Sequence, residues 1–580
     1  MDYQKSYTEW LNAPIPNELR AELVGIEGND EAIKDRFFGE LEFRTAGMRG
    51  ILGAGTTRMN VLTVNRATKG LADYLSSLGA AAKERGVVIA YDTRRYSFEF
   101  ALSAATVLSY RGVKVWLFED VRPVPMGSFA IRRLNAAAGI IITASHNPKE
   151  YNGYKVYGED GAQMGIDATA AVVEYIEKTP FFAVKTAEIG KITHDGIKGR
   201  DGLRLDENIT VIGKSVDDAY YAEILKLALS PDAVKNVGEK IKLVYTPIHG
   251  SGYVPVTTIL KKMKINASVV EEQRLPDPEF RTVSAPNPEE PDALKLGIAL
   301  AKTGDADVVL GTDPDCDRMG VALKTQNGYT LLTGNQIGSL LLDYILTRKT
   351  ETNTLPKNAA AIKTIVTTEL AARIARSHSC EIFDVLTGFK FIGEKIKEWE
   401  NSHEYTFLFG YEESYGYLSG THARDKDAVV AAMLFSEMLC YYTAKGESIL
   451  DRLNDLYRRF GFFIEKNKSI KYSGADAMQK MSDTMSKLRK QPVTAFGSAS
   501  IEFTDDYISK IRVYTAGKTE KITLPETDVL YYGLEGGGFV CIRPSGTEPK
   551  LKIYVSVSKD SKDNAERYAD EILNAAEKLL

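Results

Sequence analysis

The chain contains 580 residues, and 44% of them are hydrophobic, which is enough for several cores at roughly 100–200 residues per domain. Lys and Arg total 73 against 78 Asp and Glu, and this net charge of −5 argues against a general nucleic-acid-binding protein, which would carry a basic excess. Four scattered cysteines form neither a CxxC pair nor a disulfide framework. The start MDYQKSYTEW does not have the pattern of a signal peptide. No apolar run approaches the ~18 residues that a membrane-spanning helix needs. We therefore expect a cytoplasmic protein that does not associate with membranes.

The first part of the chain alternates between two kinds of segment. Short β-branched apolar runs, at 87–92, 113–118 and 137–144, are typical of buried strands. Between the first two, residues 97–112 have helical spacing and end at Gly112. This βαβ order predicts a parallel sheet with helices on its faces.

The same order of strands and helices occurs twice more, and a different order follows it. The later strand-like runs are 242–247, 267–272 and 306–312, with a helix at 291–304, and then 362–368, 381–388 and 405–411. After about residue 460, two strands at 537–544 and 549–558 precede a helix at 563–580. We predict three consecutive α/β domains with parallel or mixed sheets, followed by a smaller α+β domain. The predicted ranges are 1–205, 206–325, 326–460 and 461–580.

Polar clusters follow the strands in each predicted domain. In open α/β sheets, ligands bind beyond the carboxyl ends of the strands, so these positions are candidate sites. The clusters are TASHNP at 143–148, GTDPDCDR at 311–318, GYEESYG at 410–416 and RPSGTEPK at 543–550.

Three carboxylates alternate along the second cluster, at Asp313, Asp315 and Asp317. Such close anions repel one another, and a hard divalent cation with oxygen ligands relieves that repulsion. The EF-hand pattern is excluded because Arg318 stands at its glycine position and Lys324 at its final glutamate. A loop with few ligands suits Mg²⁺ completed by a phosphate oxygen, and the alternative is a solvated acidic turn.

The last cluster has the composition of an anion cradle. Arg543 offers a fork of donors, Ser545 and Thr547 offer hydroxyls, and Gly546 lets backbone N–H groups approach closely. The alternative is a hairpin turn whose Pro, Ser and Gly are chosen for their dihedral angles. In the third cluster, Glu412, Glu413 and Ser414 can bond sugar hydroxyls, or they are simply solvated.

Ser145 follows an apolar strand directly. One interpretation is that the strand ends there and Asn147-Pro148 makes the turn. The other is that the strand holds a serine in place for a reaction. An acidic metal loop, an anion cradle, sugar-type acids and an isolated serine together indicate phosphoryl transfer on a sugar phosphate.

These four motifs, in this order, resemble the α-D-phosphohexomutases, the phosphoglucomutase/phosphomannomutase family. FRTAGMRG at 43–50 resembles the family's N-terminal loop, and LTGFKFIG at 386–393 resembles another substrate loop. The resemblance covers nearly the whole chain. YNGYKVYGEDGAQ and the pairing of EES with ARDKDA at 423–428 are most similar to bacterial phosphoglucomutases of the phosphoglucomutase/phosphopentomutase branch. The resemblance implies four domains around a central cleft. In chain order, these domains carry the phosphoserine loop, the metal loop, the sugar loop and the phosphate loop.

The resemblance also implies residue roles. Ser145 would carry the phosphoryl group and bind Mg²⁺ together with Asp313, Asp315 and Asp317. Arg49 and Lys155 would neutralise transition-state charge, and Lys155 and His146 are the candidates for acid/base work. The implied substrate-binding residues are Arg318, Thr387, Gly388, Lys390, Glu412, Ser414 and Lys426, with Arg543, Ser545, Gly546 and Thr547 gripping the phosphate that is not transferred.

The implied activity is interconversion of glucose 1-phosphate and glucose 6-phosphate, with glucose 1,6-bisphosphate as intermediate and activator. Phosphopentomutase or phosphomannomutase activity by the same mechanism stays open, as does the choice between monomer and dimer. Two residues depart from the family pattern, Arg44 and Tyr411, where glycine is usual, and they leave the geometry of their loops in question.

Two other classes remain. An aspartyl-phosphate phosphatase would use Asp313 or Asp315 as nucleophile. Its motif requires Thr or Val two residues after the second aspartate, where this chain has Asp317 or Met319, so the motif fits poorly. A non-catalytic sugar-phosphate sensor is the second alternative, against which stands the presence of every implied catalytic residue.

Overall fold

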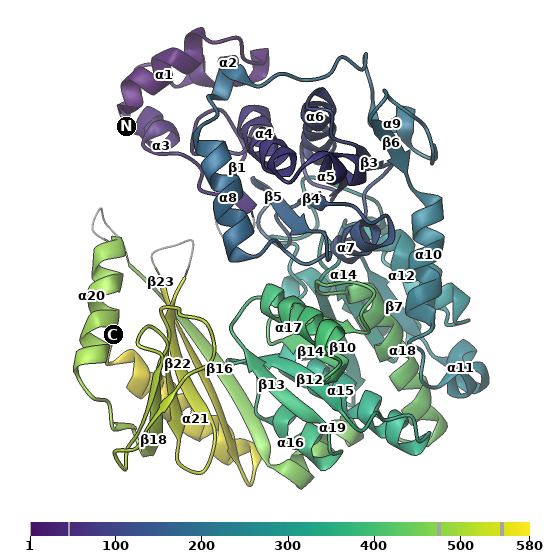
Figure 1. The fold of residues 1–580 in the computed structure, drawn as a ribbon. Coiled ribbons are helices and arrows are strands. Elements are labelled where there is room, and N and C mark those ends of the chain that lie inside the picture. The colour runs from purple at the N-terminus through teal and green to yellow at the C-terminus, as the bar shows by residue number, and fades with distance from the viewer. Residues whose placement is uncertain (1, 44–46, 473–476, 546–549) are drawn as a thin grey trace. The chain divides into compact units, whose positions relative to one another are not determined.

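The computed structural model describes residues 2–43, 47–472, 477–545 and 550–580 (Figure 1). The chain divides into two compact units. Unit one contains Met1–Leu332, Ile392–Phe407 and Tyr415–Ala444, and unit two contains Thr333–Phe391, Leu408–Ser414 and Lys445–Leu580. No helix within the described ranges is long and apolar enough to cross a membrane.

The first sheet of unit one has six strands in the order β1-β5-β4-β2-β3-β6. Its strands are β1 (Gly47–Ile51), β5 (Tyr151–Gly158), β4 (Ala138–Ile142), β2 (Val87–Tyr91), β3 (Val115–Phe118) and β6 (Ile209–Ile212). β4, β2, β3 and β6 run parallel, whereas β5 is antiparallel to both β4 and β1. The associated helices are α4 (Val61–Ser77), α5 (Ala80–Arg85), α6 (Ser97–Tyr110), α7 (Val124–Arg133) and α8 (Ile166–Glu177), preceded by α1 (Tyr3–Asn12), α2 (Asn17–Gly25) and α3 (Asp30–Phe37).

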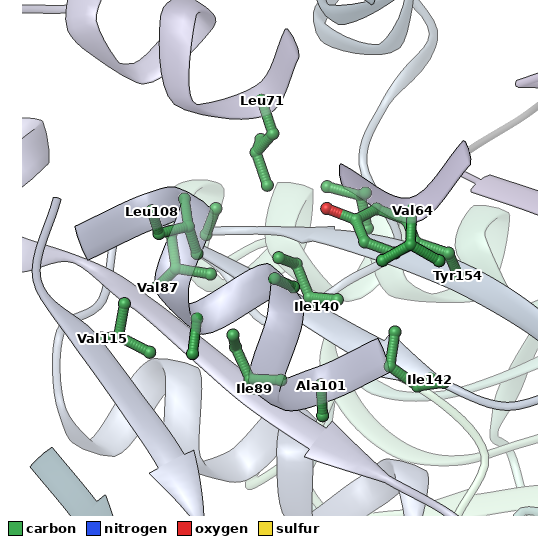
Figure 2. Packing of buried hydrophobic residues seen from close by; sticks show 14 of the residues in the cluster. Val64, Leu71, Val87, Ile89, Ala101, Leu108, Val115, Ile140, Ile142 and Tyr154 are labelled. Carbon is green, nitrogen blue, oxygen red and sulfur yellow. The ribbon is translucent and has the colours of Figure 1, made fainter. Parts of the chain in front are cut away.

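The core of this sheet shows why these segments adopt their structures. Val64 and Leu71 lie two helical turns apart on α4 and, with Leu108 on α6, pack over the apolar strand residues Val87 and Ile140 (Figure 2). All five are fully buried. Burial of apolar surface contributes roughly 25 cal/mol per Å², so this alternation of apolar strands and amphipathic helices specifies the layered fold.

The second sheet of unit one has the order β11-β10-β9-β7-β8. Its strands are β11 (Gly328–Leu332), β10 (Met319–Thr325), β9 (Val308–Thr312), β7 (Leu243–Thr246) and β8 (Ala267–Val269). β9, β7 and β8 are parallel, and the tight turn between β9 and β10 holds the three aspartates. Unit one also contains α10 (Lys214–Leu225), α11 (Pro231–Val237), α12 (Tyr253–Lys262), α13 (Glu271–Arg274), α14 (Pro291–Gly304), β15 (Gly416–Ser419) and α18 (Ala428–Ala444).

Unit two holds two further sheets. In the smaller one, β12 (Ala359–Thr364) lies between β13 (Glu381–Val385), to which it is parallel, and β14 (Thr406–Glu412). Its helices are α15 (Gly334–Glu351), α16 (Leu370–Ser377) and α19 (Ile449–Phe460). The first residues of α17 (Phe389–Ser402) also belong to this unit. The larger, antiparallel sheet has the order β16-β23-β22-β21-β18-β19-β20, with β17 paired to β18.

The strands of the larger sheet are β16 (Phe462–Lys471), β17 (Ala495–Phe496), β18 (Ala499–Asp506), β19 (Ile511–Tyr514), β20 (Thr519–Lys521), β21 (Leu530–Leu534), β22 (Phe539–Pro544) and β23 (Lys550–Lys559). Its helices are α20 (Ala477–Lys490) and α21 (Lys562–Glu577). The predicted fold class, mixed α/β domains followed by an α+β domain, is confirmed. The predicted boundaries near 205, 325 and 460 and the central cleft stay predictions.

Three predicted strands were placed wrongly at their ends. The run 381–388 forms a strand only to Val385, and α17 begins at Phe389. The run 267–272 forms a strand only to Val269, because Glu271 and Glu272 lie in the first turn of α13, where carboxylates are favourable. The run 362–368 is shifted, since β12 begins at Ala359 and ends at Thr364. Beyond it, Thr364 and Thr367 bond each other through their hydroxyls at 2.8 Å and close a turn.

Candidate active site

Ser145 lies three residues beyond the end of β4. Its backbone has φ +53°, an uncommon conformation for a residue other than glycine. Its N–H donates to Thr143 Oγ1 at 2.8 Å, and its side chain is almost fully buried. Strained backbone of this kind concentrates at functional sites, where surrounding contacts hold it in place.

Those contacts come from Arg94, which sequence reasoning did not select. Its guanidinium is fully buried and donates to backbone oxygens of the serine loop, including that of Ser145 at 2.5 Å. Asp92, the last residue of the predicted strand 87–92, accepts from the Arg94 N–H at 3.0 Å and from the Ser97 hydroxyl at 2.8 Å. The strand-end position of Asp92 was a usable signal, whereas nothing in the local pattern marked Arg94.

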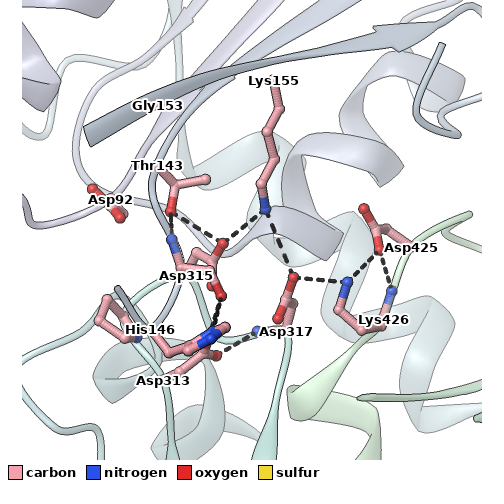
Figure 3. Close-up of polar contacts among 12 residues, drawn as sticks. Asp92, Thr143, His146, Gly153, Lys155, Asp313, Asp315, Asp317, Asp425 and Lys426 are labelled. Carbon is pink, nitrogen blue, oxygen red and sulfur yellow. Dashed lines mark hydrogen bonds and ion pairs between the residues drawn. The ribbon is translucent and has the colours of Figure 1, made fainter. Parts of the chain in front are cut away.

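The three aspartates gather around this serine. Carboxylate oxygens of Asp313, Asp315 and Asp317 all lie within 4.8 Å of one another, and the three side chains are at most 1% exposed. Ser145 Oγ donates to Asp313 Oδ2 at 2.7 Å, and Thr143 Oγ1 donates to Asp315 Oδ2 at 3.1 Å (Figure 3). The turn is held internally, because the Asp317 N–H donates to Asp313 Oδ1 at 3.1 Å.

A divalent cation fits these residues. Asp315 Oδ1 and Asp317 Oδ1 are buried and have no hydrogen-bond partner among the described residues, and an unsatisfied buried carboxylate oxygen is costly. Oxygen-only donors in a tight turn match the ligand preference of Mg²⁺. The acidic-turn alternative fails on burial, since a solvated turn would expose its carboxylates.

The acidity of the cluster is consistent with a bound cation. Burial raises the pKa of Asp313 well above its usual range, and the charges of Asp315 and Asp317 raise it further. Burial and the charge of Asp315 also raise the pKa of Asp317. Burial acts in the same sense on Asp315 and is the largest single effect. The charges of Lys155 and Lys426 and the hydrogen bonds from Asp313 and Lys155 together outweigh it and hold the pKa of that carboxyl below its usual value.

Two lysines contact the aspartates. Lys155 on β5 lies 3.1 Å from Asp315 Oδ2 and 3.8 Å from Asp317 Oδ2. Lys426 lies 3.0 Å from Asp317 Oδ2 and 3.0 Å from Asp425 Oδ1 (Figure 3). β5 can approach β4 this closely because residue 153 is glycine, where a Cβ would lie 2.5 Å from the Thr143 carbonyl oxygen.

Asp425 was missed by sequence reasoning although it stands within the quoted ARDKDA motif. Its carboxylate is 1% exposed and accepts from Tyr157 Oη at 2.7 Å, from Gln163 Nε2 at 3.1 Å and from the Lys426 N–H at 2.9 Å. It therefore fixes Lys426 against the metal-binding turn.

The remaining predicted residues of unit one surround the serine. His146 Nδ1 lies 3.1 Å from Ser145 Oγ, and burial, aided by the charges of Arg318 and Arg49, lowers the pKa of His146 well below its usual value. Arg49 on β1 is exposed and donates to Asn147 Oδ1 at 2.8 Å. Arg318 donates to Glu289 Oε1 at 2.6 Å, and its N–H donates to Asp313 Oδ1 at 3.0 Å.

Apart from Arg318 and Lys426, the predicted sugar-binding residues lie in unit two. Glu412, at the end of β14, accepts from the Gly388 N–H at 2.9 Å, so the two predicted sugar loops meet. Gly388 has φ +118°, which favours glycine. Lys390 is buried, with its ammonium 4.7 Å from the centre of the Phe391 ring, whereas Thr387 and Ser414 are half-buried.

The predicted phosphate grip lies at the end of β22 in unit two. Arg543 is half-buried, its guanidinium lies 5.7 Å from the centre of the Tyr554 ring, and Nη2 is 3.4 Å from Tyr554 Oη. The Ser545 N–H donates to the Lys550 carbonyl oxygen at 2.8 Å. Gly546 and Thr547 lie outside the described residues, and so does Arg44.

The second departure, Tyr411, is accommodated inside unit two. Its ring packs on α15 at Gly338, where a Cβ would lie 2.2 Å from the ring, and its hydroxyl lies 3.3 Å from Ser339 Oγ. The side chain therefore fills space between β14 and α15, next to the loop that carries Glu412.

Sequence comparison supplies the deciding observation. Models of the phosphoglucomutase/phosphomannomutase α/β/α domains I, II and III match residues 40–182, 218–328 and 333–460, and that of the C-terminal domain matches 509–575. The chain belongs to the phosphoglucomutase/phosphomannomutase family. This confirms the resemblance and shows that the protein is an enzyme of the phosphotransferring mutase class.

Individual members of the family agree. Proteins named phosphoglucomutase from Staphylococcus haemolyticus and Staphylococcus epidermidis are 36% and 37% identical, over 92% of this chain and 93% and 94% of their own lengths. A Paramecium phosphoglucomutase structure aligns with a TM-score of 0.65 at 17% identity, covering 93% of this chain and 95% of that one. A Burkholderia thailandensis structure of the family aligns at 0.65 and 19%, covering 93% and 97%. The two structural likenesses concern the fold.

Proposed function

We propose that this member of the family is a phosphoglucomutase, an intramolecular phosphotransferase that interconverts glucose 1-phosphate and glucose 6-phosphate. One observation carries the proposal. Ser145 Oγ lies 2.7 Å from Asp313 Oδ2, in a buried cluster of three carboxylates with two unpartnered oxygens. A serine beside a divalent-cation site is what a phosphoserine intermediate requires. The names of the staphylococcal relatives support glucose as the sugar.

The first transfer would start from phospho-Ser145. The bond between phosphorus and Ser145 Oγ breaks, a new bond forms to the free sugar hydroxyl, and the hydroxyl proton passes to a basic group of the site. Mg²⁺ held by Asp313, Asp315, Asp317 and the phosphoserine would supply charge neutralisation for the phosphoryl oxygens. Arg49 and Lys155 would neutralise the charge that remains.

The second transfer would reverse these roles. Glucose 1,6-bisphosphate turns end for end, and Ser145 Oγ takes the other phosphoryl group. The serine hydroxyl has a single proton, which it can donate to Asp313 or to His146, but not to both. The lowered pKa of His146 leaves its imidazole neutral at neutral pH, so a ring nitrogen can accept a hydrogen bond from the serine hydroxyl. Lys155 is the second candidate for acid/base work.

Several of the proposed substrate-binding residues belong to unit two. We propose that Glu412 and Ser414 bind sugar hydroxyls and that Arg543 and Ser545 hold the phosphate that is not transferred. The other proposed substrate-binding residues are Arg318, Thr387, Gly388, Lys390, Lys426, Gly546 and Thr547. We place the enzyme in the cytoplasm, since its four cysteines are all unpaired.

A kcat/KM panel over glucose, mannose and pentose 1-phosphates, with and without glucose 1,6-bisphosphate, tests the proposal. We expect glucose 1-phosphate to be the best substrate and the bisphosphate to activate. A higher value for mannose or pentose 1-phosphate would replace phosphoglucomutase by phosphomannomutase or phosphopentomutase. Absence of turnover on every sugar would favour the sensor.

Mass spectrometry of the same protein tests the intermediate. A phosphopeptide that spans residues 139–155 is expected, and Ser145→Ala should remove both the phosphate and the turnover while the circular dichroism spectrum stays unchanged. Ser77→Ala, at an exposed serine on α4, is the matched control. Release of phosphate by Ser145→Ala at the wild-type rate would favour the aspartyl-phosphate phosphatase.

A further inference from the structure

Unit two contains a cavity that none of the motif residues line. It has a volume of about 560 Å³, which lies within the usual range for small-molecule sites. Its walls are α16, the residue Asp384 on β13, and one end of the large sheet at β18, β19, β20 and β21. Figure 1 labels α16, β13 and β18 within this unit.

Most of the acids around this cavity already have cationic partners. Lys363, whose side chain is 1% exposed, lies 2.8 Å from Glu369 and 2.9 Å from Asp384. Arg512 makes a bidentate pair with Asp505, at 2.7 and 2.8 Å. Glu520 accepts from Lys518 at 2.6 Å. These charges offer little to a ligand because each is already neutralised.

Three cations at the rim lack such partners. Arg373 and Arg376 stand one turn apart on α16, and Lys521 ends β20. All three are exposed, and no side-chain hydrogen bond or ion pair joins any of them to another described residue. The guanidinium of Arg373 lies 5.7 Å from the centre of the Phe463 ring. Arg373 also lies beside a glycine turn, with Nη2 3.8 Å from the position of a Cβ on Gly537. Two arginines at this spacing suit a phosphate group.

Stacked side chains form another part of the lining. The guanidinium of Arg512 lies 3.8 Å from the centre of the Phe503 ring, and the Phe503 and Tyr531 rings are nearly parallel, 6.2 Å apart at 18°. Guanidinium planes and aromatic rings are the surfaces on which nucleic-acid bases stack. Glu502 lines the same cavity and makes no side-chain hydrogen bond with any described residue.

We propose that this cavity binds a nucleoside monophosphate. Arg373 and Arg376 hold the phosphate, the base stacks on the face of the Arg512 guanidinium that points away from the Phe503 ring, and Glu502 accepts hydrogen bonds from the ribose hydroxyls. The ligand is recognised by a single phosphate group together with a planar ring. This site is distinct from the proposed sugar and phosphate loops.

The cavity connects to the proposed phosphate grip through the large sheet. Tyr531 pairs with Cys541 on β22, and Cys541 pairs with Tyr554 on β23. The guanidinium of Arg543 lies over the Tyr554 ring. Tyr531 and Leu386, the residue before Thr387, pack in one hydrophobic cluster. Given the proposed function, an occupied cavity would change the KM for the sugar phosphate more than kcat.

Calorimetric titration of the full chain with AMP tests the binding directly and does not depend on turnover. We expect saturable binding of AMP, at least tenfold tighter than that of adenosine or of inorganic phosphate. Arg373→Ala/Arg376→Ala should weaken AMP binding at least tenfold. Arg458→Ala, at an arginine on α19 whose side chain is 69% exposed, should not change it. Arg543→Ala should also leave it unchanged, because Arg543 does not line the cavity.

Several outcomes would overturn this site. They are absence of AMP binding at millimolar concentration, undiminished binding by the double variant, and loss of binding in Arg543→Ala, which would place AMP in the active site instead. Binding of inorganic phosphate as tight as that of AMP would overturn the nucleoside part. If the double variant loses its wild-type circular dichroism spectrum, the single variants Arg373→Ala and Arg376→Ala take its place, and undiminished AMP binding by both overturns the site.

Discussion

Arg94 donates hydrogen bonds from one guanidinium nitrogen to the carbonyl oxygens of Ser145 and Asn147, both at 2.5 Å. Its other terminal nitrogen reaches the carbonyl oxygens of Pro148 at 2.9 Å and Tyr151 at 3.1 Å. One buried cation therefore holds the whole loop that presents the serine. The left-handed backbone of Ser145 is held from behind by a residue that does not touch the serine hydroxyl.

Arg94→Lys should lower kcat about 100-fold and lower the Tm by several degrees. Lysine keeps the charge but loses the planar fork, and hydrogen bonds to charged groups contribute roughly 1.5–3 kcal/mol each. Arg95→Lys is the control, because Arg95 is exposed and pairs with Glu279 at the surface. Steady-state kinetics and thermal melts measure both effects. Equal losses in the two variants would show that the loop does not depend on the Arg94 fork.

Asp315→Asn should abolish the dependence of activity on Mg²⁺ together with the activity itself. The substitution removes a proposed ligand oxygen and one of the charges that a cation balances. In the wild-type protein, EDTA should stop turnover and Mg²⁺ should restore it. Calorimetric titration with Mg²⁺ gives a readout independent of turnover, and Mg²⁺ binding by Asp315→Asn as tight as wild type would refute the assignment.

Asp425→Asn should reduce kcat/KM by about 10- to 100-fold. Asparagine keeps the shape of Asp425 but not its charge, so the 3.0 Å ion pair with Lys426 is lost. One lost charged hydrogen bond corresponds to roughly 1.5–3 kcal/mol, or one to two decades of rate. Asp218→Asn, on the exposed face of α10, is the control. An unchanged kcat/KM would mean that Lys426 keeps its place without Asp425.

Arg543→Ala should weaken kcat/KM by about 10- to 100-fold in both directions of the reaction, because the same grip would serve either end of the sugar. Ser145 should still be phosphorylated, since Arg543 does not contact it in the proposed mechanism. Assays with glucose 1-phosphate and glucose 6-phosphate, together with phosphopeptide analysis, measure this. Loss in one direction only would assign Arg543 a different role.

The stability of the folded protein should decrease as the pH rises, because of the titration of Glu465 on β16. Burial raises the pKa of this carboxyl from 4.5 to about 7, so the folded state favours its protonated form. The contribution of protonated Glu465 to the free energy of unfolding is fully present below pH 4.5, and it is lost as the pH rises through about 7. At 1.36 kcal/mol per pKa unit it is at most about 3 kcal/mol, because the side chain is only half-buried.

Glu465→Gln keeps the shape of the protonated acid and should therefore raise the Tm at pH 8 while leaving it nearly unchanged at pH 4. Thermal melts across this range measure the effect. Glu447→Gln, at an exposed glutamate, should change the Tm equally little at both pH values. A Tm of Glu465→Gln that stays parallel to wild type at every pH would contradict the shift.

Much of the candidate site could be predicted from short segments of the sequence. Apolar strands ending in TASHNP and GTDPDCDR predicted a serine and three carboxylates at strand ends, and the structure brings Ser145 and Asp313 within hydrogen-bond distance. The helix expected at 291–304 has those bounds in the structure. Period and composition are local properties, so they specify elements and the residues at their ends.

Contacts between distant segments were decided only by the tertiary structure. β5 pairs antiparallel with β4 and so places Lys155 beside Asp315, 160 residues away in the chain. Arg94 and Asp425 act through backbone carbonyls and a neighbouring lysine, interactions that leave no periodic trace in the sequence. The charge balance of the metal-binding turn depends on burial and on partners from several segments, and both exist only once the chain has folded.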